Sequence, residues 1–138
     1  MTDTAARRAK WPLIYVAAAA IMAAALAFLL MSAPRSDGAI AWTDPMIQGG
    51  WMAWTLPVAL FFWVIASLLV LMTILAIRFP ETPRIGILRI ETTRGDRLFI
   101  SLLGSAFIHL IWLFFAGPPL WGATALCLAY AAAVFVWV

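Results

Sequence analysis

The residue best suited to chemistry in this chain is His109, its single histidine. It lies about 11 residues into the apolar stretch from Leu98 to Ala116, which helix rise places well inside a bilayer. An ionisable side chain at that depth marks a candidate functional site. Counting in steps of three and four along a helix puts Ser101, Ser105 and Trp112 on the same face as His109.

Three interpretations of this face compete. The first is a packing face, where Ser101 and Ser105 let another helix approach and a neutral His109 bonds across to it; we favour this one. The second is an axial ligand to haem or bacteriochlorophyll, since a small residue four positions before the histidine leaves room for a macrocycle. A bis-histidine haem would need a second histidine, which the chain lacks. The third is a proton relay, but no apolar segment contains Asp, Glu or Lys to take the proton.

Enzymatic chemistry is poorly supported by the sequence. A hydrolytic triad needs a nucleophile, a base and an orienting group together, and no aqueous carboxylate reaches His109 at its expected depth. The sequence has no glycine-rich phosphate loop and no zinc-spaced cluster, and Cys127 has no second cysteine to pair with. We therefore expect a protein that is not an enzyme and holds no cofactor of its own.

The elements that carry these residues follow from composition. Of 138 residues, 66% are apolar and 11% are charged, whereas soluble domains are nearer half apolar and a quarter charged. A spanning helix needs about 20 apolar residues. The sequence predicts an all-α, polytopic membrane protein with four transmembrane helices, over Trp11 to Ser32, Trp51 to Ile77, Leu98 to Ala116 and Leu120 to Val138.

Local signals refine these spans. The first apolar stretch exceeds the usual 7–15 residues of a signal-peptide core, which favours a retained span. Residues 33–50 are rich in Pro, Gly and Asp and predict a loop. Thr93 and Asp96 have the spacing of a capping box, which predicts a helix start. Gly117, Pro118 and Pro119 end the third span, so spans three and four should form an antiparallel hairpin.

Basic residues give the orientation by the positive-inside rule. Arg7, Arg8 and Lys10 precede the first span, and only Arg35 follows it. Five arginines lie between spans two and three: Arg78, Arg84, Arg89, Arg94 and Arg97. Both termini and this Arg-rich connection should therefore be cytoplasmic, with the loop at residues 33–50 on the far side of the membrane.

The position of the Arg-rich connection beside apolar segments argues against a nucleic-acid-binding face. Two interpretations of this connection remain. It can set topology and attract the anionic headgroups of membrane lipid. It can also contact a cytoplasmic partner subunit, and the residues predicted for that contact are Arg84, Arg89, Arg94, Asp96 and Arg97.

Small residues provide a second predicted contact surface. Gly122, Ala125, Ala129 and Ala133 follow one face of span four, and span one is rich in alanine. Such faces drive close helix packing in lipid. Their extent exceeds what four short spans need internally, which predicts docking onto other integral membrane subunits.

Four stretches of the sequence are characteristic: Trp51 to Pro57, Thr92 to Ile100, Ala106 to Leu110 and Pro119 to Gly122. Together they resemble a family of predicted small integral membrane proteins of unknown function in proteobacteria. The likeness covers roughly Gly50 to Val138, so residues 51–138 would be a three-helix membrane domain and residues 1–50 an extra N-terminal transmembrane helix plus periplasmic loop. Members tend to be encoded beside components of glycerol and related polyol ABC transporters. The resemblance implies an accessory subunit of such a transporter in the bacterial inner membrane, close to its permease or ATPase. The alternative is a pigment- or haem-associated subunit of a photosynthetic or respiratory complex that uses His109.

Overall fold

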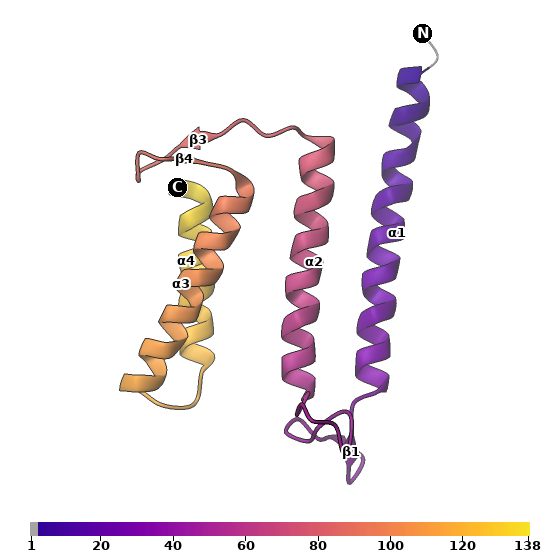
Figure 1. The fold of residues 1–138 in the computed structure, drawn as a ribbon, viewed down its shortest axis with the longest axis vertical. Coiled ribbons are helices and arrows are strands. Elements are labelled where there is room, and N and C mark those ends of the chain that lie inside the picture. Colours follow the sequence, from indigo (N-terminus) through magenta and orange to yellow (C-terminus); the bar gives the residue numbers. More distant parts are fainter. Residues whose placement is uncertain (1–2) are drawn as a thin grey trace. The chain divides into compact units, whose positions relative to one another are not determined.

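The structure, a computed structural model, describes residues 3–138, with side chains from Lys10 onward (Figure 1). Most of this part of the chain forms four helices: α1 (Asp3–Met31), α2 (Leu56–Arg78), α3 (Arg94–Phe115) and α4 (Trp121–Trp137). Two short antiparallel hairpins lie in the connections between helices. One pairs β1 (Arg35–Ser36) with β2 (Ala39–Ile40), and the other pairs β3 (Arg84–Ile85) with β4 (Glu91–Thr92). The mostly helical prediction is confirmed, and the hairpins are an addition to it.

The chain divides into two compact units, residues 1–73 and 74–138. In the described residues, α1, α2 and α3 each contain a segment long and apolar enough to cross a membrane, and α4 is apolar but has 17 residues. A 17-residue helix rises about 25 Å, less than the roughly 30 Å of a hydrocarbon core. Three long candidate spans and a shorter one thus stand where four were predicted. Arg7 and Arg8, two of the three basic residues that precede the first predicted span, have side chains outside the part of the chain that the structure describes.

The connection between α1 and α2 is more regular than the predicted loop. β1 and β2 pair with Arg35 opposite Ile40 and Ser36 opposite Ala39. Asp37 and Gly38 turn between them with φ of 51° and 80°. Two successive positive φ values give the twist that closes a two-residue hairpin, and Asp-Gly is a favoured sequence for that turn.

The start of α2 differs from the prediction of Trp51. The backbone of Pro45 is bridged to Thr55, and Met46 donates its N–H to the Trp54 carbonyl at 2.7 Å. Residues up to Thr55 are held by this pairing, so the helix begins at Leu56. Pro57 then lies in the first turn, where its missing N–H breaks no helical bond.

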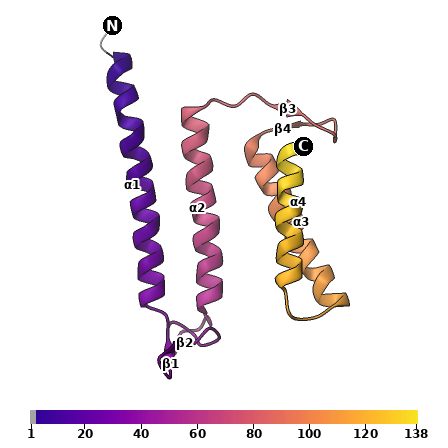
Figure 2. The same ribbon diagram turned by 180° about the vertical axis from the view of Figure 1, so that it is seen from behind.

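The predicted start of α3 is confirmed. Thr93 is the N-cap, and its backbone N–H donates to Asp96 Oδ2 at 2.8 Å while Asp96 N–H donates to Thr93 Oγ1 at 3.3 Å. The helix ends at Phe115, before Gly117 with a φ of 64°. The chain then returns as α4, which packs along α3 in the second unit (Figures 1 and 2).

Candidate functional site

Two of the predicted packing residues on α3 satisfy their own hydroxyl groups within the helix. Ser101 is buried and donates to the Leu98 carbonyl at 2.8 Å, and Ser105 donates to the Ser101 carbonyl at 2.7 Å. Neither hydroxyl therefore needs a partner across the helix interface. Their contribution is small size, which lets α4 lie close to this face of α3.

His109 faces α4. Its Nδ1 lies 2.8 Å from the Ser105 carbonyl oxygen, and its Nε2 lies 3.4 Å from the Thr124 hydroxyl oxygen on α4. The Thr124 hydroxyl donates to the Leu120 carbonyl at 3.1 Å. The buried Cys127 thiol lies 3.3 Å from Nδ1 and donates to the Ser105 carbonyl at 3.5 Å. The histidine thus belongs to a small polar cluster between the two helices.

The haem or bacteriochlorophyll interpretation needs a ring nitrogen of His109 that is free to bind the metal. Nε2 of His109 lies 3.4 Å from Thr124 Oγ1 on α4. The axial-ligand role stays a prediction. Among the described residues, no three or more His, Cys, Asp or Glu side chains form a group that could hold a metal ion.

Trp112 and Gly122 form a second contact of the hairpin. A Cβ added at Gly122 would lie 2.4 Å from the Trp112 ring, so only glycine lets the indole lie against α4 at this point. The indole Nε1 donates to the Pro119 carbonyl in the connecting turn at 3.2 Å. The two residues were both predicted to pack, and the structure brings them together.

A contact between Gly104 on α3 and Tyr130 on α4 was not predicted from the sequence. A Cβ at Gly104 would lie 2.3 Å from the Tyr130 ring, whose hydroxyl donates to the Ile100 carbonyl at 3.4 Å. A glycine inside a helix costs about 1 kcal/mol relative to alanine, and a phenol in an apolar helix needs a polar partner. Those two signals together could have indicated the pair.

The predicted small-residue ridge of α4 is only partly used by the hairpin. The α4 side chains buried in the second unit are Ala123, Cys127 and Val134. Ala125 and Ala129 are exposed, while Gly122 and Ala133 are half-buried. The internal contact therefore uses a different line of residues, and the alanine ridge is left on the surface of this unit.

The Arg-rich connection folds back onto the C-terminal end of α4. Arg84 Nη2 donates to the carbonyls of Phe135 and Val136 at 3.0 and 3.2 Å. Ile87 N–H donates to Trp137 O at 2.9 Å, and Thr92 Oγ1 donates to Val138 O at 3.0 Å. The last carbonyls of a helix have no partner within it. The β3–β4 hairpin supplies partners, and a cation suits the negative end of the helix dipole.

Other members of the predicted cytoplasmic contact are also bonded inside the chain. Arg94 forms an ion pair with Glu81 at 3.6 Å, and its backbone N–H donates to the same carboxylate. Asp96 completes the capping box with Thr93.

Arg97 and Arg89 behave in opposite ways. Arg97 is 8% exposed, and its guanidinium donates to the Thr92 hydroxyl at 3.3 Å and the Thr92 carbonyl at 3.1 Å. Arg89 lies exposed at the turn of the β3–β4 hairpin, with a φ of 56°. Of the five residues predicted to contact a partner, Arg84, Arg89 and Asp96 are exposed, and Arg84 and Asp96 are also hydrogen-bonded within the chain. The contact itself stays a prediction.

These features define a helical, polytopic membrane protein whose last two helices form a capped hairpin. Residues 51–138 match the model of a family described as "Predicted small integral membrane protein (DUF2160)". The match covers more than half of the chain, and the chain belongs to this family. The match begins at Trp51, so α1 and the β1–β2 hairpin lie outside it. No curated protein and no solved structure matches the chain.

Proposed function

We propose that this chain is a non-enzymatic accessory subunit that stabilises a larger complex in the inner membrane of a proteobacterium. The complex proposed is an ABC transporter of the glycerol type. The observation that supports the proposal is the ridge formed by Ala125 and Ala129, which is exposed on α4 while Ala123 and Cys127 serve the internal contact.

The ridge suits another transmembrane helix. Lipid tails are as apolar as leucine, so burying apolar surface alone gives no drive for helices to associate in a bilayer. Small side chains spaced four residues apart let two helix backbones approach and gain dispersion contacts over a long line. Ala125 and Ala129 offer such a line to a permease helix.

The proposed topology has four spans, with both termini and the Arg-rich connection in the cytoplasm. Arg78, Arg84, Arg89, Arg94 and Arg97 outnumber the single Arg35 of the opposite loop. The β3–β4 hairpin would then lie at the cytoplasmic rim, where Arg89 is available to an ATPase subunit or to anionic lipid.

A tagged pull-down from gently solubilised native membranes tests the proposal. We expect permease or ATPase subunits of a polyol transporter to accompany the natural chain. In an Ala125→Leu/Ala129→Leu double variant, their recovery should fall about tenfold, because bulky side chains hold the partner helix away. Ala106→Leu on α3 is the matched control, since Ala106 is also exposed, and it should retain the partners.

Three results would contradict parts of the proposal. If the chain is recovered alone, it is not a subunit of a larger complex. If it is recovered with an unrelated complex, the complex is not an ABC transporter. Undiminished recovery with the double variant would show that the ridge is not the contact.

The pigment- or haem-associated alternative has a separate check. An absorbance spectrum of the purified chain with a Soret or near-infrared band, lost in His109→Ala, would establish it. Nε2 of His109, the nitrogen that would bind the metal, lies 3.4 Å from Thr124 Oγ1 on α4.

A further inference from the structure

The first unit contains a cavity of about 670 Å³ between α1 and α2. One wall comes from α1 through Met22, Ala25 and Leu29, and the other from α2 through Ala59, Trp63 and Ala66. Alanines on both helices set the walls back from each other. All of the lining residues belong to residues 1–73, so the cavity is formed within one unit.

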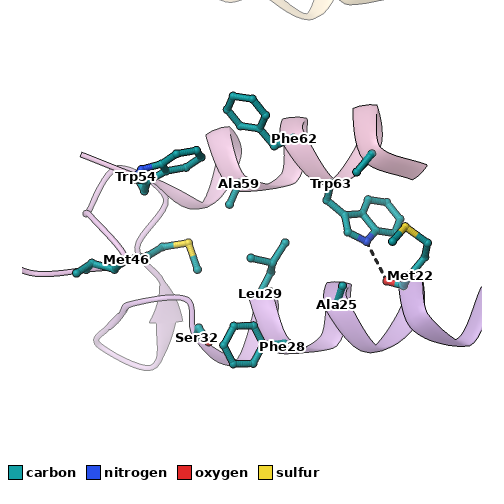
Figure 3. Close-up of a pocket in the computed structure, with 12 residues that line it drawn as sticks. Met22, Ala25, Phe28, Leu29, Ser32, Met46, Trp54, Ala59, Phe62 and Trp63 are labelled. Carbon is teal, nitrogen blue, oxygen red and sulfur yellow. Dashed lines mark hydrogen bonds between the residues drawn. The ribbon is translucent and has the colours of Figure 1, made fainter. Parts of the chain in front are cut away.

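The cavity is closed at both ends along the helices (Figure 3). At one end the Trp63 indole donates to the Met22 carbonyl at 2.9 Å and so joins α2 to α1. The Ser67 hydroxyl donates to the Trp63 carbonyl at 2.8 Å and lies 3.2 Å from the Met22 sulfur at the same junction. At the other end, Met46 from the connecting loop points into the space between the helices, and Trp54 lines the cavity on the α2 side.

The lining has the polarity of a hydrocarbon site with one polar end. Ser32 is the one lining residue with a hydroxyl group, and it lies at the loop end. The rest of the lining is hydrophobic and carries no charge. An apolar space of this kind is poorly suited to water and well suited to apolar ligands.

The cavity is continuous with the lipid-facing surface. Phe28, Ile47 and Phe62 line it and are also 70%, 64% and 52% exposed. Phe28 and Phe62 lie on the apolar helices α1 and α2, whose exposed side chains contact lipid in an integral membrane protein, so lipid has a lateral path into the cavity. A helix with its side chains is about 10–12 Å wide and does not fit between helices joined by the Trp63–Met22 bond. A flexible hydrocarbon chain does.

We propose that this cavity binds one acyl chain of a phospholipid from the leaflet on the loop side, with the headgroup beside Ser32 and the tail end near Trp63. The site lies mostly on α1 and the loop, outside the family-matched residues, and is independent of the proposed transporter association. It gives α1 a role in holding a structural lipid against α2.

Photo-crosslinking in nanodiscs tests this proposal on the full chain. The discs contain phosphatidylcholine and phosphatidylglycerol with a trace of phosphatidylcholine carrying a diazirine in one acyl chain, and adducts are mapped by mass spectrometry. In the natural chain we expect Met22 to be labelled about fivefold more than its neighbour Ile21, which is 64% exposed to bulk lipid.

Two adjacent alanines provide matched variants. Ala25 lines the cavity, and its neighbour Ala24 is exposed outside it. Ala25→Phe should fill the cavity and lower the labelling of Leu29 and Trp63 about fivefold, whereas Ala24→Phe should leave it unchanged.

Equal labelling of Met22 and Ile21 in the natural chain would overturn the proposal without reference to any variant. Unchanged labelling in Ala25→Phe would overturn it as well.

Discussion

Arg97 shows how this fold accommodates a charge beside an apolar helix. Its guanidinium is buried against Thr92, and hydrogen bonds to the hydroxyl and carbonyl of that one residue replace water. Burying a charge without hydrogen-bond partners would cost several kcal/mol. The contact therefore makes Arg97 a part of the fold rather than a free contact residue.

Replacing Arg97 by alanine should lower the free energy of unfolding of the second unit by about 2–4 kcal/mol, because two charge-assisted hydrogen bonds are lost and the Thr92 carbonyl loses its partner. Denaturant titration of the purified chain in mild detergent measures the change. Arg89→Ala is the control: Arg89 is exposed, and this change should have an effect within about 0.5 kcal/mol. Equal effects of the two variants would contradict the assignment.

At the scale of elements, the β3–β4 hairpin is fitted to the end of α4 by shape as well as by hydrogen bonds. A Cβ added at Gly86 would lie 2.4 Å from the carbonyl oxygens of Trp137 and Val138. These are backbone atoms, which cannot rotate away as a side chain does. The close approach requires glycine.

Gly86→Ala should therefore displace the hairpin and destabilise the second unit by about 1–3 kcal/mol. Hydrogen exchange at the Ile87 amide, which donates to Trp137 O, reports the displacement directly. Gly95→Ala is the control on α3, where a new Cβ would meet Thr93 Oγ1 at an ordinary 3.7 Å. Retained protection of Ile87 in Gly86→Ala would argue against this close fit.

The capping box of α3 gives a second prediction at this scale. Thr93→Ala removes the side-chain acceptor for the Asp96 N–H and should cost about 1 kcal/mol. Thr93→Ser keeps a hydroxyl at the same place and should restore most of the loss. Thermal unfolding in detergent distinguishes them, and identical midpoints for natural chain and Thr93→Ala would refute the assignment.

The parts of the fold that the sequence predicted are those set by local rules. Apolar length revealed the helices, and the Thr93–Asp96 spacing revealed the start of α3. The predicted start of α2 at Trp51 was wrong. Pro45 pairs with Thr55, and local helical patterns in the sequence do not indicate such a pairing. The bonds from Arg84 to the α4 carbonyls join residues about fifty positions apart, and charge patterning could show only that the arginines cluster.

Some residues of the candidate site were also predicted from the sequence, and others were not. His109, Trp112 and Gly122 do lie in the α3–α4 contact, because helical spacing places them on facing surfaces. Ala125 and Ala129 were predicted to contact other integral membrane subunits, and the rotation of α4 about its axis decides whether they stay exposed for such a contact. Small residues occur on more than one side of α4, and only the packing of Tyr130 and Trp112 settles which side faces α3.

At the scale of the whole molecule, the proposed topology has a direct labelling test. The natural chain contains one cysteine, Cys127, and it is buried. Cysteines introduced at Ser36 and Leu88, both exposed, can thus be labelled with little background.

With a membrane-impermeant maleimide applied to spheroplasts, Ser36→Cys should react at once and Leu88→Cys only after the membrane is opened, because the positive-inside rule places the Arg-rich connection in the cytoplasm. Labelling of the natural chain, in which Cys127 is the single cysteine, measures the background reaction. Reaction of Leu88→Cys in closed spheroplasts would reverse the proposed orientation.

The shortness of α4 has a consequence for the surrounding bilayer. Helix α2, with 23 residues, rises about 35 Å, whereas the 17 residues of α4 rise about 25 Å. A hydrophobic segment shorter than the hydrocarbon thickness draws the leaflets together, at a fraction of a kcal/mol per Å of mismatch. If α4 is the fourth span, as proposed, the lipid layer around the chain should be thinner beside α4 than beside α2. A neighbour with an equally short span would relieve that deformation by sitting at the same place.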